Sequence, residues 1–412
     1  KPFHKMPAKS KSCGKPLPFI QCKDNKFHVM PEASRVLSEI KGKVSVICVA
    51  GPYRTGKSFL LNRLIGRQTG FQVGGTVKAC TKGIWLWGEP IYDAKAGITY
   101  VFLDTEGLGS VDQDQLFDTQ IFSLAVLLSS YFVLNTTGTI NEQSLEQLDL
   151  VVQCTKQIRV HEEEEADEKS LSEHFPSFLW VLRDFVLQMK DDDDRDISST
   201  QYLEQCLQPQ KGTRKGVKEK NRIREALKTV FPDRDCITLV RPTTDENKLQ
   251  TLYEQPFSSL RPQFQQQVQA LQTTVLSRAK PKTVSGSAAN GAAVVQLAQI
   301  YTAAINQGAV PAISSAWASV VESQTRHSFD QAIKLVEQGV AKAVPATQGG
   351  ASSSSSSKGQ GQSCAAVEEK ALDVVFAALT SQAVATLRAG ALGSGQIEYF
   401  SASLSLSLSL SL

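Results

Sequence analysis

The sequence has little that would hold a metal cluster or a disulfide framework. Histidines at metal-ligand spacing and Cys-x-x-Cys pairs are both missing. The eight cysteines are scattered along the chain, at Cys13, Cys22, Cys48, Cys80, Cys154, Cys206, Cys236 and Cys364. This distribution argues against a disulfide-stapled or zinc-stapled fold and favours reduced thiols. We therefore expect a cytoplasmic protein.

Net charge and long apolar runs are also scarce. The chain has 44 basic and 41 acidic residues, and an excess of three is too small to indicate nucleic acid or an anionic membrane as the main partner. The longest apolar run, 121–134, is too short and too rich in hydroxyl groups to cross a bilayer. We expect it to be a buried helix that continues into a buried strand.

The two ends of the sequence carry little information. The chain begins at Lys1 rather than Met, so we expect a native N-terminus that lies further upstream. It ends at Leu412 without a cysteine box for prenylation, after an alternation of Ser and Leu. We assign 391–412 to a low-complexity tail and expect no lipid anchor, while membrane association by other means stays open.

Most of the chain alternates short apolar strands with amphipathic segments. With 412 residues, of which 41% are apolar, it is long enough for two units. The alternation predicts an α/β domain with a mainly parallel sheet. The expected strands are 44–51, 83–90, 98–105, 129–136, 177–184 and 235–242. Several of them end in polar residues, so we expect ligand binding at the carboxyl edge of the sheet.

Two acidic runs interrupt this pattern, at 161–169 and 191–196. Blocks of like charge do not pack, so we expect both runs to be solvated loops rather than metal sites.

The last part of the sequence is helical in character. Apolar stripes predict one helix that ends at Gly308 and a longer one that Pro311 opens. A third helix is expected from about 366 to 389, after a break rich in Ser and Gly. We therefore divide the chain into a first domain at 1–283 and an all-α helical domain at 284–390.

A phosphate-binding loop follows the first expected strand. The segment GPYRTGKS fits the pattern G-x-x-x-x-G-K-[ST] at Gly51, Gly56, Lys57 and Ser58. An apolar strand precedes it and an amphipathic helix follows, as the motif requires. The glycines let backbone N–H groups turn toward a β-phosphate, and Lys57 reaches the β and γ oxygens. Ser58 is the expected Mg²⁺ ligand.

The segment ITYVFLDTEGLG supplies the second half of such a site. Asp104 ends its strand and is expected to serve Mg²⁺ through a water, while the amide of Gly107 contacts the γ-phosphate. Between the two motifs, Thr81 is the candidate hydroxyl for the metal and Thr76 is the competing choice. A purely structural role for Thr81, as a cap of the next strand, is the alternative.

The sequence lacks the Asn-Lys-x-Asp motif that reads guanine. The segment NKLQ at Asn247 comes near it but has Gln250 in place of the acid. Asp184 follows a strand at the place where that motif would occur, and its carboxylate could accept the N1 and N2 hydrogens of guanine. Chemistry alone favours guanine over adenine only weakly, so an ATP-using enzyme stays open at this point.

These motifs, together with TKGIWLW, FSLAVLLSS and GTINEQSLEQL, resemble the guanylate-binding proteins, large GTPases of the dynamin superfamily that are related to the atlastins. The resemblance runs from about Pro18 to Leu271 and continues more weakly through 301–317. It implies a P-loop GTPase fold, GTP as substrate, Mg²⁺ as cofactor and a homodimer formed through the GTPase domains.

The resemblance also assigns residues to the nucleotide. It implies that guanine is recognised through Arg183 and Asp184, and that the segment near Arg241 and Pro242 caps the base. The complete set of expected nucleotide-binding residues is Gly51, Tyr53, Arg54, Thr55, Gly56, Lys57, Ser58, Phe59, Gly107, Arg183, Asp184, Arg241 and Pro242.

The resemblance implies hydrolysis assisted by four residues: Arg54, Lys57, Thr81 and Glu106. Arg54 corresponds to an arginine finger that acts in cis on the charge of the transition state, although a side chain that only points to solvent is the alternative. Glu106 matches an acidic residue in the network around the attacking water. Ala79 stands where hydrolytic members usually carry serine. The alternative function is therefore a GTP-binding assembly switch with little hydrolysis.

Overall fold

The computed structural model describes most of the chain. The described residues are 14–72, 83–108, 115–141, 175–191, 193–212, 215–284, 287–343 and 377–388, with the single positions Ser144, Leu145, Asp149, Ile158, Glu398 and Ser401. Two compact units are distinguished, at 1–317 and 318–412.

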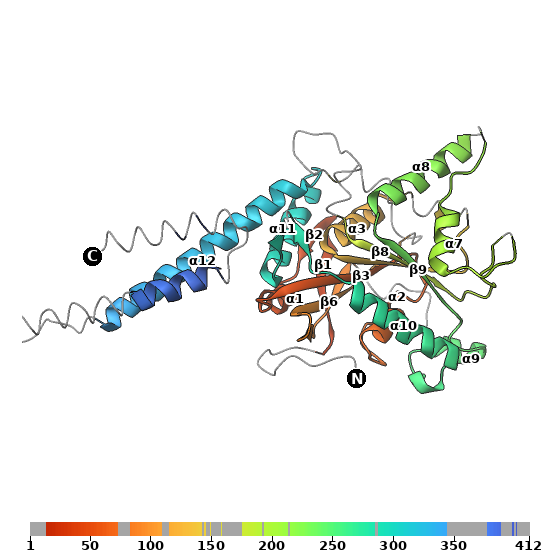
Figure 1. Ribbon diagram of the computed structural model, residues 1–412, viewed down its shortest axis with the longest axis horizontal. Coiled ribbons are helices and arrows are strands. Elements are labelled where there is room, and N and C mark those ends of the chain that lie inside the picture. Colours follow the sequence, from red (N-terminus) through yellow and green to blue (C-terminus); the bar gives the residue numbers. More distant parts are fainter. Residues whose placement is uncertain are drawn as a thin grey trace, which may run out of the picture. The chain divides into compact units, whose positions relative to one another are not determined.

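A nine-stranded sheet forms the centre of the described part of the first unit (Figure 1). Its strands are β1 (Pro16–Lys23), β2 (Lys26–Val29), β3 (Lys43–Ala50), β4 (Ile84–Trp87), β5 (Ile91–Asp93), β6 (Ile98–Thr105), β7 (Tyr131–Thr137), β8 (Ser177–Arg183) and β9 (Arg234–Leu239). The order is β2-β1-β4-β6-β3-β7-β8-β9, with β5 paired to β6. Five neighbouring strands, β6, β3, β7, β8 and β9, run parallel to one another. The other four, β1, β2, β4 and β5, pair antiparallel.

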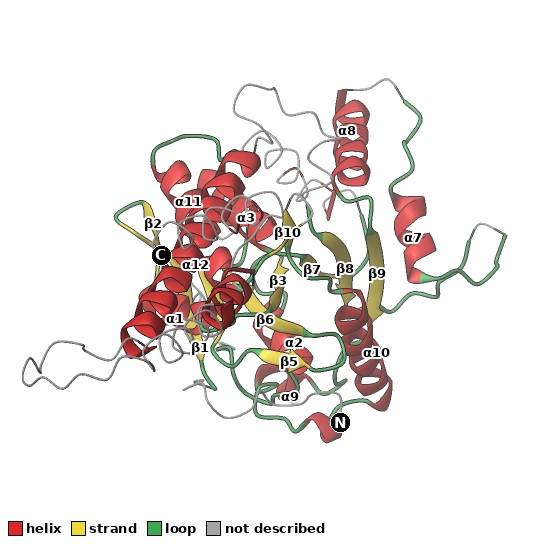
Figure 2. Cartoon of the chain, turned by 60° about the vertical axis from the view of Figure 1, so that its left-hand side comes forward, coloured by secondary structure: helices red, strands yellow, loops and turns green. Residues whose placement is uncertain are grey.

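Helices cover both faces of this sheet (Figure 2). They are α1 (Pro31–Ser38), α2 (Lys57–Leu64), α3 (Gln115–Leu128), α7 (Ser199–Cys206), α8 (Lys215–Val230), α9 (Glu246–Gln250), α10 (Pro262–Arg278) and α11 (Gly291–Asn306), with a short 3-10 turn η1 (Phe257–Ser259). Helices α2 and α10 share one face, where the rings of Phe59 and Phe264 stack with centroids 6.3 Å apart. On the other face Phe122 of α3 packs edge-on against Phe132 of β7, at 5.2 Å.

The central strands are buried on both faces, because helices cover them on both sides. All residues of β3 from Val44 to Ala50 are buried, which agrees with a continuous apolar run rather than an alternating one. Parallel register brings Val49 of β3 beside Asp104 of β6 and Val133 of β7. The carboxyl ends of these strands therefore meet at one edge of the sheet.

The α/β fold with a mainly parallel sheet and a helical C-terminal region is confirmed. The run at 121–134 forms the end of α3 and the start of β7, as expected. In the acidic run at 191–196, the residues 193–196 are exposed and Arg195 bonds to Asp191, while Asp192 and the run at 161–169 lie outside the described residues. The pattern missed β1, β2 and β5 and did not reveal the antiparallel direction of β4.

A short hairpin links α10 to α11. Strands β10 (Thr283–Val284) and β11 (Ser287–Ala288) pair antiparallel. Beside the hairpin, the backbone N–H of Lys282 donates to Val44 and that of Val44 donates to Ala289. The linker is therefore attached to the amino end of β3.

Helix α12 (Ile313–Ala343) starts at the end of the first unit and continues into the second. In the second unit, Ala332 and Val336 pack against Ala383 and Leu387 of a helix at 377–388. The predicted helix at about 366–389 is thus helical in its described part. Among the helices that the structure describes, none combines the length and apolarity of a membrane span.

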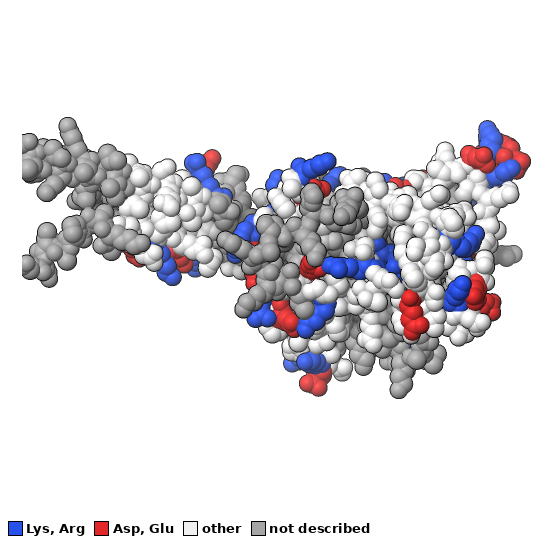
Figure 3. All heavy atoms as spheres, turned by 90° about the horizontal axis from the view of Figure 1, so that it is seen from below, with Lys and Arg blue, Asp and Glu red and all other residues white. Residues whose placement is uncertain are grey.

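Basic and acidic side chains lie beside one another in several places on the surface shown in Figure 3. This mixed distribution on that face agrees with the small net charge of +3.

Candidate functional site

The loop between β3 and α2 has a backbone that few residues allow. Gly51 has a φ of 147°, and a Cβ there would lie 2.1 Å from the carbonyl oxygen of Asn135. Gly56, the N-cap of α2, has a φ of 76°, and Arg54 also lies in the left-handed region at 66°. Left-handed residues within such a turn direct successive N–H groups toward one centre. The loop is therefore shaped to bind an anion at the start of α2.

The segment after β6 is attached to this loop. The N–H of Tyr53 donates to the carbonyl of Leu108 at 2.9 Å, and the N–H of Leu108 donates to that of Gly51 at 3.1 Å. A Cβ on Gly107 would lie 2.6 Å from the Cα of Tyr53 and 3.1 Å from Nζ of Lys57. Only glycine permits this approach, so the two predicted motifs meet as the sequence indicates.

Lys57 is buried inside the loop. Its Nζ donates to the carbonyl of Pro52 at 3.0 Å. Burial lowers the pKa of its ammonium group to about 8, against the opposing effect of the carboxylates of Asp104, Glu106 and Asp118. The ammonium thus lies where several charges converge. Asp118, on α3, was not identified from the sequence.

Ser58 and Asp104, the two described residues of the predicted metal site, lie side by side. The hydroxyl of Ser58 donates to Oδ2 of Asp104 at 2.6 Å, and Asp104 is fully buried at the end of β6. Hydroxyl and carboxylate oxygens are the hard ligands that Mg²⁺ prefers, and phosphates and water usually complete its shell. The two residues therefore fit Mg²⁺, although the described residues contain no cluster of three or more His, Cys, Asp or Glu that could hold a metal. Thr81, Thr76 and Ala79 lie outside the described residues.

Glu106 is bonded to Gly83, the first described residue after position 82. Its Oε2 accepts from the N–H of Gly83 at 2.9 Å, and its own N–H donates to the carbonyl of Gly83 at 2.8 Å. The carboxylate is 4% exposed. This double contact fixes the orientation of Glu106 beside the phosphate-binding loop.

Arg54 is exposed and lies against its neighbour. Its guanidinium carbon is 4.9 Å from the ring centroid of Tyr53, and Nη2 donates to the hydroxyl of Tyr53 at 3.1 Å. The cation is attracted by the face of the ring. In this structure Arg54 is therefore held at the rim of the loop, outside the cluster formed by Lys57, Ser58 and Asp104.

Arg183 lies beneath the loop. Its Nη1 donates to the carbonyl of Gly56 at 3.1 Å and, at 3.4 Å, to that of Thr55. The guanidinium also lies over the ring of Phe59, 5.4 Å from the centroid. Burial lowers the pKa of Arg183, while Asp184 opposes the shift.

Asp184 follows β8 directly and has a left-handed backbone conformation. Its φ is 56°. Its Oδ1 is buried and, among the described residues, accepts no hydrogen bond. Such an acceptor is suited to a ligand that brings its own donors.

The predicted base cap is bonded to the start of α10. The carbonyl of Pro242 accepts from the N–H of Arg261 at 2.9 Å, and the carbonyl of the exposed Arg241 accepts from Nη1 of Arg261 at 3.3 Å. Within the described residues, no hydrogen bond connects either of them to the loop. The near-match NKLQ forms α9, which Asp245 caps.

A second residue of the site, besides Asp118, was not identified from the sequence. Asn135, fully buried near the end of β7, donates through Nδ2 to the carbonyl of Thr55 at 3.0 Å and to its hydroxyl at 2.8 Å. The available signal was a polar residue at the carboxyl end of an expected strand.

These features define a class, the α/β proteins with a phosphate-binding P-loop. Within that class the chain matches the family described as Guanylate-binding protein, N-terminal domain, over residues 24–284, and Guanylate-binding protein, C-terminal domain, over residues 285–350. The chain belongs to the guanylate-binding protein family.

Similar relatives include three guanylate-binding proteins. Guanylate-binding protein 3 of Mus musculus is 38% identical over 323 residues, which cover 77% of this chain and 52% of that protein. Guanylate-binding protein 1 of Chlorocebus aethiops is 37% identical over 335 residues, 80% and 56% of the two chains. Guanylate-binding protein 7 of Homo sapiens is 37% identical over 337 residues, 80% and 52% of the two chains. The chain spans about half the length of the curated relatives it matches.

Proposed function

We propose that the protein is a Mg²⁺-dependent GTPase that binds and hydrolyses GTP and dimerises through its GTPase domain. One observation carries the proposal. The phosphate-binding loop holds the buried Lys57, and its Ser58 bonds to Asp104. Arg183, at the end of β8, bonds to the same loop and is followed directly by Asp184. Family membership supports guanine as the base.

Each polar group of the loop has a role in this proposal. Lys57 and the N–H groups of the loop bind the β- and γ-phosphates, and Gly107 contacts the γ-phosphate. Ser58, Asp104 and Thr81 would hold Mg²⁺. When bound, the ion neutralises charge on the phosphate oxygens.

Asp184 accepts the N1 and N2 hydrogens of guanine in this proposal. Its buried, unpaired Oδ1 supports the role, because two donors on one edge of the base match a carboxylate. Arg241 and Pro242 belong to the segment that caps the base. Two hydrogen bonds of Arg261, one from its backbone N–H and one from its guanidinium, hold that segment to the start of α10.

Hydrolysis is proposed to need a second copy of the chain. Arg54 lies at the rim, on the ring of Tyr53, and Glu106 is already fixed at Gly83. Contact between two GTPase domains would move Arg54 from the ring onto the phosphoryl oxygens, where an arginine stabilises the charge of the transition state.

Protein concentration tests this proposal. We expect GTP turnover per molecule, measured with Mg²⁺ and with GDP and GMP resolved as products, to rise with protein concentration. In Arg54→Ala the turnover should fall while nucleotide binding survives, whereas Arg35→Ala, which removes an exposed arginine of α1, should behave as wild type. Unchanged turnover in Arg54→Ala would exclude the finger role.

Ala79 favours a second candidate function, a GTP-binding assembly switch with little hydrolysis. Without a serine hydroxyl at this position, only the backbone carbonyl is left to orient the attacking water. Single-turnover hydrolysis by Ala79→Ser decides the point. An acceleration over the parent chain would support the switch, and equal rates would remove its motivation.

We further propose the division of the chain into a GTPase domain at 1–283, a helical domain at 284–390 and a tail at 391–412, in a cytoplasmic protein. Limited proteolysis with and without a GTP analogue would locate these boundaries. The question of membrane association is addressed by flotation with vesicles in the same two states.

A further inference from the structure

The underside of the phosphate-binding loop is held by two side chains from neighbouring strands. Asn135, on β7, donates from Nδ2 to both the carbonyl and the hydroxyl of Thr55, at 3.0 and 2.8 Å. Arg183, at the end of β8, donates to the carbonyl of Gly56 at 3.1 Å and more weakly to that of Thr55. The hydroxyl of Thr55 in turn donates to the carbonyl of Pro52 at 2.9 Å. The nitrogen of the Asn135 amide must face Thr55, since a carbonyl oxygen only accepts.

These contacts bear on the direction of two peptide groups. The carbonyl of Gly56 also accepts from the N–H of Leu60 at 2.9 Å, as the first bond of α2, so Arg183 adds to a direction that the helix already favours. A trans peptide is planar, so its C=O and N–H point in opposite directions. The carbonyl of Thr55 belongs to the peptide whose N–H is that of Gly56, and the carbonyl of Gly56 belongs to the peptide whose N–H is that of Lys57. Holding both carbonyls on the underside therefore directs both N–H groups to the opposite side, toward the phosphate position.

The glycines of the loop allow the close approach of Arg183 and Asn135 from below. A Cβ on Gly56 would lie 2.5 Å from Nη1 of Arg183, so glycine is needed for this approach. A Cβ on Gly51 would collide with the backbone of Asn135. Both glycines of the motif therefore have a partner below the loop.

Arg183 also places positive charge under the loop. It is 5% exposed, and among the described residues no carboxylate lies within ion-pair distance of it. Its Nε has no hydrogen-bond partner among the same residues. A buried charge of this kind acts on an anion through a medium of low polarity, in which its field is little screened.

We propose that Asn135 and Arg183 are positioning residues that orient the N–H groups of Gly56 and Lys57 toward the β-phosphate of a nucleoside diphosphate or triphosphate. Base recognition then falls to Asp184 alone. This inference rests on the proposed function, because it takes a guanine nucleotide as the ligand. It also revises the expectation that Arg183 itself recognises guanine.

Binding of GMP and GDP to the full-length chain tests the inference, because only GDP has a β-phosphate. In Asn135→Asp, which keeps the shape but loses the donor, we expect affinity for GDP to fall about tenfold or more and affinity for GMP to change by less than about twofold. Arg183→Met should behave in the same way, and Arg183→Lys should recover part of the affinity for GDP. Asn62→Asp is the matched control: Asn62 is equally buried, but its amide bonds to Phe71 rather than to the loop.

The ratio of affinities for GDP and IDP separates phosphate positioning from base recognition. Inosine lacks the 2-amino group, so a residue that reads guanine changes this ratio when it is substituted. We expect the ratio to stay at the wild-type value in the Asn135 and Arg183 variants and to fall in Asp184→Asn.

Three results would overturn the inference. They are an equal loss of affinity for GMP and GDP, a fall of the GDP to IDP ratio in Arg183→Met, and wild-type affinity for GDP in both sets of variants. If Asn135→Asp does not fold, as judged by its thermal unfolding without ligand, Arg183→Met and Arg183→Lys decide the matter. A wild-type chain that binds no GDP would overturn the proposed function, and this inference with it.

Discussion

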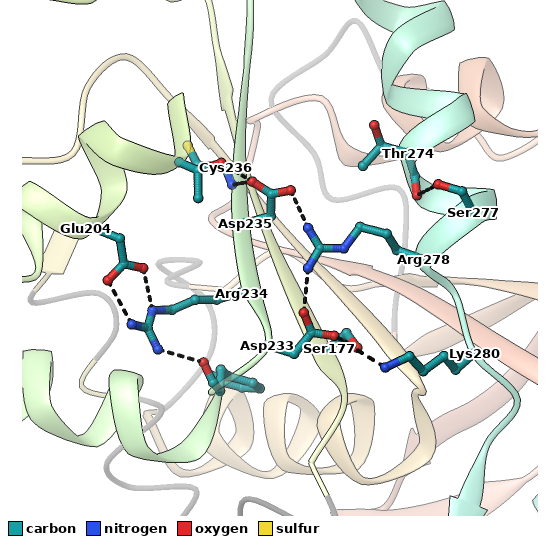
Figure 4. Close-up of polar contacts among 12 residues, drawn as sticks. Ser177, Glu204, Asp233, Arg234, Asp235, Cys236, Thr274, Ser277, Arg278 and Lys280 are labelled. Atoms are coloured by element: carbon teal, nitrogen blue, oxygen red, sulfur yellow. Dashed lines mark hydrogen bonds and ion pairs between the residues drawn. The ribbon is translucent and has the colours of Figure 1, made fainter. Parts of the chain in front are cut away.

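The carboxyl ends of the parallel strands (the carboxyl edge) and their amino ends (the amino edge) both hold positive charge, but they stabilise it differently. At the carboxyl edge, Lys57 and Arg183 donate to backbone carbonyls, and among the described residues neither has a carboxylate within ion-pair distance. At the amino edge, Arg278 lies between Asp233 and Asp235, as Figure 4 shows. From beyond ion-pair distance, the carboxylates of Asp104, Glu106 and Asp118 favour the charge of Lys57, but burial outweighs them. A buried cation that is not fully compensated is costly. The carboxyl edge is therefore incomplete without an anion, whereas the amino edge is complete by itself.

At the amino edge, the ionisation of Asp233 agrees with this difference. Burial opposes the charge of Asp233, but hydrogen bonds from Ser177, at 2.6 Å, and from Arg278 outweigh it and lower the pKa of the carboxyl group. On the other side of β9, Arg234 pairs with Glu204 through both oxygens, at 2.8 Å (Figure 4). The amino edge thus consists of ion pairs that attach α7 and α10 to the edge strand.

One residue of the amino edge departs from this rule. Lys282 is 4% exposed and its Nζ donates to the carbonyl of Ser129 at 2.9 Å. Among the described residues, no carboxylate lies within 4 Å of it. Burial lowers the pKa of Lys282 to about 7, so this side chain loses its proton at a pH far below the ordinary range of lysine. An ion-binding role at one edge and a neutral lysine at the other can be separated by mutation.

The largest effect is expected for Lys57→Met. Methionine keeps the buried stem but removes the ammonium, so GTP turnover should fall on the order of 100- to 1,000-fold. Without nucleotide, the thermal stability should be unchanged or higher, because burial costs the ammonium more than the carboxylates of Asp104, Glu106 and Asp118 return, as its lowered pKa indicates. Turnover and unfolding temperature, measured on the same samples, test both. Lys282→Met is the control, with wild-type turnover; a loss of stability in Lys57→Met would contradict the comparison.

The second prediction concerns pH and Lys282. Folding lowers its pKa from the ordinary value of 10.5 to about 7, so between these values the unfolded chain binds more protons than the folded one. The free energy of unfolding therefore rises with pH across that window, by at most about 1.4 kcal/mol per unit, and the contribution is lost below pH 7. Lys57, with a pKa of about 8, contributes in the same direction.

Urea unfolding of wild type and Lys282→Met at a series of pH values isolates this contribution, because the contribution of Lys57 is common to both chains. The free energy of unfolding of the wild type minus that of Lys282→Met should increase as pH rises from 7 to 9. A constant difference would mean that Lys282 is charged in the folded protein.

The third prediction concerns the ion pairs of the amino edge. Arg278→Met removes the partner of two carboxylates, and since the arginine side chain is 33% exposed we expect a loss of about 1–2 kcal/mol rather than the full cost of a buried pair. Nucleotide affinity should not change. Arg278→Lys, which retains the charge, should recover part of the stability in urea unfolding. Weaker GDP binding in Arg278→Met would show that the two edges are coupled.

The sequence predicted the parallel part of the fold because its strands are buried on both faces and appear as apolar runs. It did not reveal β1, whose two prolines interrupt its apolar pattern, or β2, a four-residue strand at the edge of the sheet that contains polar residues. The direction of β4 was also missed, since a short apolar run looks the same in both directions.

The site could be predicted as far as its motifs are local. The loop at 51–58 and Asp104 were identified because chemistry and spacing define them within a few residues. Asn135 was missed because its partner, Thr55, is 80 positions away in the chain. The contact of Arg183 with the carbonyl of Gly56 depends on the pairing of β8 with β7, where Arg183 lies beside Thr137. Such contacts follow from the register of the sheet, which one sequence does not reveal.

The smallest predicted effect compares two asparagines, one at each edge. Asn290 lies in the linker that is attached to the amino end of β3, and its Oδ1 accepts from the N–H of Ala293 at 2.9 Å as the N-cap of α11. Asn290→Ala should cost about 1 kcal/mol in urea unfolding and leave GDP affinity unchanged, whereas a change at Asn135 should alter GDP affinity. Asn290→Ser, which retains a capping oxygen, should restore most of the stability. Weaker GDP binding in Asn290→Ala would contradict the separation of the two edges, because the capping hydrogen bond is made to its own helix.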